Sequence, residues 1–209
     1  MDTILIFAGG DHPLQELASE LPIPDLVVAA DSGYETAVAL GYRVDVVVGD
    51  MDSIKTSPLP DHLVVERYPI DKDQTDLDLA LELAIREDPV RVVIVGGTGG
   101  RHDHELATAG LICSSRWQDV DEIDWISSRS RSHVVRRRKT VQGDVGSIVT
   151  LLPVGGTVEG ITTRGLQWEL SGAVFESGST WGVSNVMRAP VADISTSRGC
   201  LLVIFPLES

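Results

Sequence analysis

The sequence has little cysteine, few basic residues and no long apolar run. Cys113 and Cys200 lie far apart and match no zinc-ligand spacing, which predicts two reduced, buried thiols in a cytoplasmic protein. The 17 Lys and Arg residues face 31 Asp and Glu residues, and the resulting net charge of −14 argues against binding to nucleic acid or anionic lipid. No apolar run reaches transmembrane length, and the acid at position 2 favours a first strand over a signal peptide. An anionic substrate would need a metal ion or a local basic patch to approach.

The 209 residues are enough for one large domain or two small ones. Up to about residue 128, short β-branched runs alternate with helix-like segments, the rhythm of a doubly wound α/β fold. Most of the runs are apolar nearly throughout, as in a parallel sheet covered on both faces. The expected strands are Thr3–Ala8, Leu26–Ala30, Val44–Val48, His62–Glu66, Arg91–Val95 and Glu122–Ile126. The expected helices are Pro13–Glu20, Gly33–Leu40, Thr75–Glu87 and Asp103–Arg116.

Glycine, aspartate or both follow every one of the first five expected strands. Parallel strands bring their carboxyl ends to one edge of a sheet, where ligands bind, so these segments should converge. The segments are Gly9-Gly10-Asp11, Asp31-Ser32-Gly33, 49–53 (GDMDS), 68–78 (YPIDKDQTDLD) and 96–104 (GGTGGRHDH).

Several of these acids also have a structural interpretation. Thr75 with Asp78 fits a capping box, and Asp76 would suit the first turn of a helix. Asp103 could cap a helix, and Asp31 could form an Asx turn. Asp71 is interpreted as a loop residue and Asp78 as a capping residue, whereas Asp73 and Asp76 are the functional pair of this segment.

A group of carboxylates at one edge predicts a metal site. Two carboxylates about 4 Å apart repel by roughly 4 kcal/mol at an effective dielectric near 20, so a cluster favours a cation. Mg²⁺ suits the position because it uses one or two carboxylates together with substrate phosphate oxygens. The glycines at 96–100 and Arg101 could hold phosphate groups. His102 and His104 are interpreted as solvated loop residues rather than metal ligands.

The pattern of the second half of the sequence predicts an all-β module. The basic run Arg129–Lys139 is interpreted as a solvated edge strand, with a phosphate contact as the alternative. Trp168 is interpreted as a core residue, with stacking on a flat ligand as the alternative. Strands are expected at Ser147–Leu152, Gly156–Ile161, Ala173–Glu176, Thr180–Val183, Ala192–Ser197 and Leu201–Pro206. We expect a small sandwich or barrel after a boundary between residues 129 and 143.

Six motifs together resemble the thiamine pyrophosphokinase (thiamine diphosphokinase) family. They are AADSG at 29–33, VVGDMDS at 47–53, KDQTDLDLAL at 72–81, GGRHDH at 99–104, TTRGLQWEL at 162–170 and GSTWGVSN at 178–185. The resemblance implies an enzyme that transfers the pyrophosphoryl group of ATP to the thiamine hydroxyl, giving thiamine diphosphate and AMP with Mg²⁺. It implies a Rossmann-like, mostly parallel catalytic and nucleotide-binding domain at 1–135 and a smaller, thiamine-binding β-sandwich at 136–209. It also implies a homodimer in which thiamine is held between the catalytic domain of one subunit and the β-domain of the other.

The resemblance and the strand-end segments together predict the site residues. The catalytic residues would be Asp31, Asp73 and Asp103, and the metal ligands Asp50, Asp52 and Asp76. ATP would contact Gly9, Gly10, Ser32, Gln74, Thr75, Gly99, Gly100 and Arg101. Thiamine would contact Trp168, Ser184 and Asn185.

Two departures from the family pattern concern these contacts: Val186 stands where the family commonly has Glu, and the helix after GGRHDH lacks the usual Asn. Alternative functions are a related metal-dependent transferase, such as a pterin pyrophosphokinase or a D-x-D glycosyltransferase, and a non-catalytic nucleotide- or thiamine-binding regulator.

Overall fold

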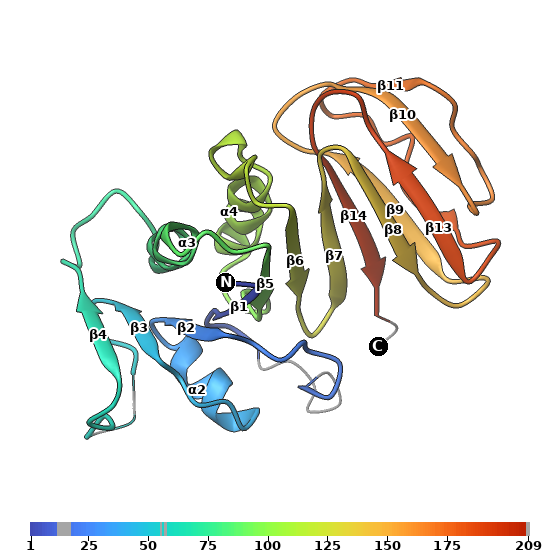
Figure 1. Ribbon diagram of the computed structural model, residues 1–209. Coiled ribbons are helices and arrows are strands. Elements are labelled where there is room, and N and C mark those ends of the chain that lie inside the picture. Colours follow the sequence, from blue (N-terminus) through green and yellow to red (C-terminus); the bar gives the residue numbers. More distant parts are fainter. Residues whose placement is uncertain (12–17, 55, 57, 208–209) are drawn as a thin grey trace. The chain divides into compact units, whose positions relative to one another are not determined.

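The computed structural model describes residues 1–11, 18–54, 56 and 58–207 (Figure 1). The chain forms two units, of which the first comprises Met1–Thr108 with Asp119–Ser128 and the second Ala109–Gln118 with Arg129–Ser209. No helix in the described part of the chain is long and apolar enough to span a membrane. Most of the expected helix Pro13–Glu20 lies outside the described residues.

A parallel sheet forms the centre of the first unit. Its strand order is β6-β5-β1-β2-β3-β4, and every pairing between these neighbours is parallel. The buried residues of β1, β2 and β5 are almost all aliphatic, as expected for strands of a sheet that is covered on both faces. The strands are β1 (Thr3–Phe7), β2 (Leu26–Ala30), β3 (Val46–Gly49), β4 (Val64–Arg67), β5 (Arg91–Val95) and β6 (Glu122–Ile126). The predicted α/β class is confirmed.

Helices α2 (Gly33–Ala39) and α3 (Asp76–Arg86) lie on opposite sides of the sheet and both pack against β1 and β2 (Figure 1). Helix α3 starts where the sequence predicts, because the Thr75 hydroxyl accepts the N–H of Asp78 at 3.2 Å. Its buried face consists of leucines and alanines, including Leu77, Leu81 and Ala84.

Helix α4 (His102–Ile112) is shorter than predicted. The Ser114 hydroxyl accepts the N–H of Arg116 and begins a separate 3₁₀ turn, Ser115–Trp117, so the expected helix to Arg116 is interrupted. The Arg136 side chain also donates to the carbonyls of Ile112 and Ser114, at 2.8 and 3.0 Å. It thereby supplies hydrogen-bond donors to carbonyl groups at the C-terminal end of the helix.

The second unit is a sandwich of two antiparallel layers, with strand orders β12-β9-β14-β7 and β11-β10-β13-β8. Residues of both layers share one core that includes Leu151, Ile161, Phe175 and Val203. The strands are β7 (Ser130–Val135), β8 (Arg138–Gln142), β9 (Ile148–Pro153), β10 (Val158–Arg164), β11 (Ala173–Phe175), β12 (Asn185–Val186), β13 (Val191–Ser195) and β14 (Leu201–Pro206).

Two expectations for this unit change. The basic run forms two strands, β7 and β8, and β8 lies at the edge of its layer, as predicted for the run. The predicted strand Thr180–Val183 is wrong, because this segment is a turn. The Ser179 hydroxyl accepts the N–H of Trp181, and Gly182 lies so close to Leu151 that a Cβ would meet its carbonyl oxygen at 2.2 Å.

Candidate active site

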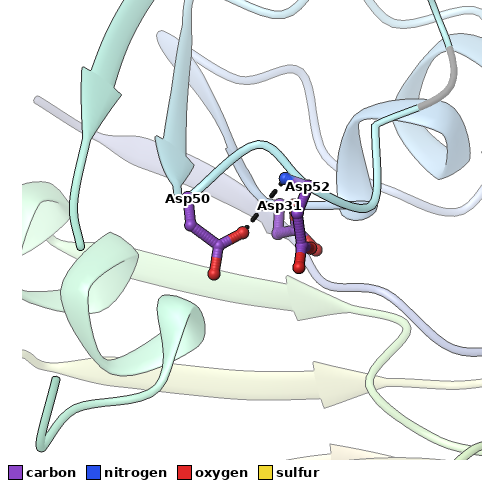
Figure 2. Close-up of side chains that lie close together, drawn as sticks. All are labelled: Asp31, Asp50 and Asp52. Atoms are coloured by element: carbon purple, nitrogen blue, oxygen red, sulfur yellow. Dashed lines mark hydrogen bonds between the residues drawn. The ribbon is translucent and has the colours of Figure 1, made fainter. Parts of the chain in front are cut away.

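Three aspartates meet at the carboxyl ends of two neighbouring strands. Asp31 follows β2, and Asp50 and Asp52 follow β3 (Figure 2). Each offers a carboxylate oxygen, and these oxygens lie within 4.8 Å of one another. The Asp50 carboxylate also accepts the N–H of Asp52 at 3.1 Å, which fixes the turn between them. The predicted convergence of these strand ends is present.

Asp31 has an unusual backbone and an unusual side-chain environment. Its φ is +44°, a region that few residues other than glycine adopt, and its N–H donates to the Val48 carbonyl at 2.9 Å. Burial, with smaller contributions from the neighbouring Asp76 and Asp50, raises the pKa of the Asp31 carboxyl. Its Oδ1 is buried without a hydrogen-bond partner in the described part of the chain. Such an oxygen is suited to a cation.

Asp76 lies beside this cluster because Gly49 allows its approach. A Cβ on Gly49 would stand 3.0 Å from Asp76 Oδ1 and 3.2 Å from Asp31 Cβ. Asp76 is also the first residue of α3, where the helix dipole favours a carboxylate. Both interpretations of Asp76, as a first-turn acid and as a member of the cluster, are therefore compatible with its position.

Lys72 links two of these carboxylates. Its Nζ lies 3.1 Å from Asp76 Oδ1 and 3.6 Å from Asp50 Oδ2. The hydrogen bond that the Asp52 N–H donates lowers the pKa of the Asp50 carboxyl, and Lys72 lowers it to a smaller degree. The sequence analysis assigned no role to Lys72, although its spacing of four residues from Asp76 is a signal for an ion pair.

The donor set fits Mg²⁺. All the oxygens are carboxylate oxygens, which hard divalent cations prefer, and one of them has no other partner among the described residues. Asp50 and Asp31 are partly buried and Asp52 is exposed, so a metal here would remain open to a substrate phosphate.

Glycine-rich segments after β1 and β5 bond to each other. The N–H of Gly97 donates to the Gly9 carbonyl at 2.9 Å, and the N–H of Asp11 donates to the Thr98 carbonyl at 2.6 Å. At Gly10, with φ +117°, a Cβ would meet the Thr98 carbonyl oxygen at 2.3 Å. A Cβ on Gly9 would meet Ser32 Oγ at 2.2 Å, which places Gly9 against the segment after β2. The predicted ATP-binding positions Gly9, Gly10 and Ser32 thus lie together.

Buried Trp125 on β6 holds this glycine-rich edge. Its indole N–H donates to the Gly96 carbonyl at 2.8 Å. The sequence did not indicate this role, because a tryptophan in an apolar strand is typical of any core.

The other predicted nucleotide-binding and catalytic residues are exposed or hydrogen-bonded to neighbouring side chains. Arg101 and Asp103 are exposed and pair with each other, with Arg101 Nε 3.1 Å from Asp103 Oδ1, and this pairing lowers the pKa of the Asp103 carboxyl. The Gln74 side chain donates to Glu82 at 2.9 Å. Gly99 is partly buried, and Gly100 and Asp73 are exposed; neither Asp73 nor Asp103 belongs to the three-aspartate group found among the described residues.

In the second unit, Asn185 fixes the backbone of Trp168. The buried Asn185 side chain accepts the Trp168 N–H at 3.1 Å and donates to the Trp168 carbonyl at 2.9 Å. The Trp168 side chain is 56% exposed, so its interpretation as a core residue is wrong. Ser184 is exposed, has φ +59°, and donates its N–H to the Thr150 hydroxyl. The three predicted thiamine positions therefore belong to one small region.

Comparison with known proteins agrees with both units. Residues 18–122 match the family profile described as "Thiamin pyrophosphokinase, catalytic domain", and residues 132–201 match "Thiamin pyrophosphokinase, vitamin B1 binding domain". Thiamine pyrophosphokinase of Bacillus subtilis is 28% identical, over 98% of this chain and 98% of its own. Thiamine pyrophosphokinase 1 of Oryza sativa subsp. japonica is 25% identical, over 87% of this chain and 72% of its own.

Solved structures give the same result. The crystal structure of the Bacillus subtilis thiamine pyrophosphokinase has a TM-score of 0.85 at 26% identity, covering 100% of both chains. That of the Geobacillus thermodenitrificans enzyme has a TM-score of 0.83 at 28% identity, covering 99% of this chain and 98% of its own. The resemblance read from the motifs is confirmed, and the chain belongs to the thiamin pyrophosphokinase family of enzymes.

Proposed function

We propose that this protein transfers the pyrophosphoryl group of ATP to the hydroxyl of thiamine, giving thiamine diphosphate and AMP. The observation that carries the proposal is the cluster of Asp31, Asp50 and Asp52 at the strand ends, with Asp76 beside it. Membership of the family supports the same activity, and the relatives carry it in their names. A binding protein without catalysis would have little need of so many neighbouring acids.

Asp50, Asp52 and Asp76 would hold Mg²⁺. When bound, the ion supplies positive charge that neutralises the phosphate oxygens, which phosphoryl transfer mainly requires. The glycine-rich segments around Gly9, Gly10 and 96–100 would place backbone N–H groups along the phosphates, and the exposed Arg101 would add a fork of donors. Ser32, Gln74 and Thr75 would lie near the nucleotide.

The transfer forms one bond and breaks another. The thiamine hydroxyl oxygen bonds to the β-phosphorus of ATP, the bond from that phosphorus to the oxygen of the α-phosphate breaks, and AMP leaves. The hydroxyl proton passes to a carboxylate, for which Asp31, Asp73 and Asp103 are the candidates. The raised pKa of Asp31 suits a proton acceptor, whereas the exposed Asp73 and Asp103 suit orientation of the hydroxyl.

We further propose that residues 1–135 carry catalysis and nucleotide binding and that residues 136–209 bind thiamine. The exposed ring of Trp168 would stack on the heteroaromatic rings of thiamine, with Ser184 and Asn185 beside it. The cationic thiamine would also be attracted by a chain of net charge −14. We propose a homodimer and, from the two free buried thiols, a cytoplasmic location.

One assay tests the reaction. The protein is incubated with ATP, Mg²⁺ and thiamine, and AMP and thiamine diphosphate are measured. We expect both products in equal amounts from the wild type, and a loss of about 10²-fold or more in kcat for Asp52→Asn. Asp61→Asn, which changes an exposed turn residue in the same way, is the control and should retain normal turnover.

Four outcomes would contradict this proposal. ADP as the sole product would indicate a different transfer, and AMP formed with a pterin but not with thiamine would indicate the related pyrophosphokinase. Near-normal turnover of Asp52→Asn would refute the metal assignment. Tight binding of thiamine and ATP without products would indicate a regulator.

A further inference from the structure

Lys72 occupies an unusual position for a lysine. Its ammonium contacts Asp50, which follows β3, and Asp76, which begins α3, at 3.6 and 3.1 Å. It also donates to the Pro69 carbonyl at 3.1 Å. The side chain is only 14% exposed, which is low for a residue type that is usually solvated. Three acceptors from three segments therefore hold one positive charge at the edge of the carboxylate cluster.

The charge balance of the cluster explains why the ammonium is stable there. Although burial opposes its charge, the contacts with Asp76 and Asp50 raise the pKa of Lys72. Because the ammonium contacts two carboxylates, it offsets part of the repulsion within a group that includes Asp31 and Asp52.

The ammonium also contacts the acids that the proposed metal site needs. Asp50 and Asp76 are two of the three proposed Mg²⁺ ligands, and both already face Lys72. A divalent cation and an ammonium on the same carboxylates repel each other strongly at such distances. The four-carbon stem of lysine allows the ammonium to withdraw without moving the backbone.

We propose that Lys72 is the internal counter-ion of the carboxylate cluster: it holds Asp50 and Asp76 together and competes with the divalent cation for their oxygens. Lys72 is thus a positioning residue that sets the metal affinity of the protein. As a consequence, the protein without nucleotide binds a divalent cation only weakly, and the metal enters mainly with its nucleotide. The inference rests on the metal site of the proposed function.

The test compares Lys72→Met, which removes the charge but keeps the length of the stem, with Lys72→Arg, which keeps the charge. Lys139→Met on β8 is the charge-matched control in the second unit. Metal affinity is measured with Mn²⁺, by the electron paramagnetic resonance signal of the free ion, without nucleotide. Thermal unfolding is followed in a chelator and in saturating Mn²⁺.

For Lys72→Met we expect Mn²⁺ affinity about tenfold tighter than wild type, because a cation has been removed from direct contact with the ligands. In chelator its melting temperature should fall by about 3 °C, and saturating Mn²⁺ should remove that difference. Lys72→Arg and Lys139→Met should keep wild-type affinity.

The proposal fails if Lys72→Met binds Mn²⁺ no more tightly than the wild type, or if it melts as the wild type does in chelator. A loss of stability that is the same with and without Mn²⁺ would show a purely structural lysine, which also refutes it. Binding of Mn²⁺ to none of the proteins would refute the metal site as well. Formation of AMP by the wild type is measured separately, so failure of the proposed reaction is distinguishable from failure of this inference.

Discussion

At the scale of single residues, backbone strain marks the predicted site. Four non-glycine residues in the described part of the chain have positive φ, and three of them, Asp31, Met51 and Ser184, lie in motifs predicted to bind substrate or metal. Such conformations cost free energy and persist where the surrounding structure imposes them. Met51 stands between Asp50 and Asp52, so its strained backbone belongs to the turn that carries both carboxylates.

The partly buried carboxylate of Asp31 should lower the stability of the folded protein, although it serves the proposed reaction. We predict that Asp31→Asn raises the free energy of unfolding in chelator by about 1 kcal/mol, because a charge among like charges is removed. Asparagine also tolerates the positive φ of this position. The same variant should lose turnover by about 10²-fold or more. Urea unfolding and the AMP assay measure the two effects.

The pH dependence of Asp31→Asn gives an independent check. The folded-state pKa of Asp31 is raised, so the wild type loses stability from this group as pH rises from the ordinary aspartate pKa through the raised value. Asp31→Asn lacks that loss of stability. Its greater stability relative to the wild type should therefore appear at pH values above the raised pKa and vanish below the ordinary aspartate pKa. An advantage that persists at lower pH would contradict the electrostatic explanation.

At the scale of elements, Trp125 on β6 supports the glycine-rich edge through its bond to the Gly96 carbonyl. Trp117 offers a matched case: it is equally buried, and its indole N–H donates to the Leu111 carbonyl at the same 2.8 Å. Only the Trp125 bond holds a segment predicted to bind phosphate. The two residues therefore separate a structural effect from an effect on the site.

We predict that Trp125→Phe and Trp117→Phe each lower the free energy of unfolding by about 1–2 kcal/mol, since each removes the indole hydrogen bond to a main-chain carbonyl. Only Trp125→Phe should raise KM for ATP, by about tenfold, because the glycine-rich segment loses its anchor. Urea unfolding and steady-state kinetics test both statements. Equal KM values for the two variants would mean that Trp125 serves the core alone.

The sequence predicted the strand ends of the first unit better than the turns of the second. Apolar runs that end in glycine and aspartate specify parallel strands and their ligand edge, so Asp31, Asp50 and Asp52 were found. The turn at Thr180–Val183 was missed because it depends on contact with Leu151, which is distant in sequence. Exposure of Trp168 likewise depends on the bonds from Asn185, which local periodicity does not reveal.

At the scale of the whole molecule, the predicted site residues fall into different units. The carboxylate cluster belongs to the first unit, and Trp168, Ser184 and Asn185 belong to the second. If the protein is the proposed homodimer with thiamine between the catalytic part of one subunit and the β-sandwich of the other, each site takes residues from both subunits.

Complementation between two defective subunits tests this arrangement. Asp52→Asn and Trp168→Ala are co-expressed with different tags, and the heterodimer is purified on both. One of its two sites would carry both substitutions and the other neither, so we predict about half of wild-type kcat/KM for thiamine. The Asp52→Asn homodimer should be nearly inactive, and the Trp168→Ala homodimer should lose about tenfold, as expected for a lost stacking contact. If each site instead uses a single chain, every site of the heterodimer carries one defect, and its activity cannot exceed the mean of the two homodimers.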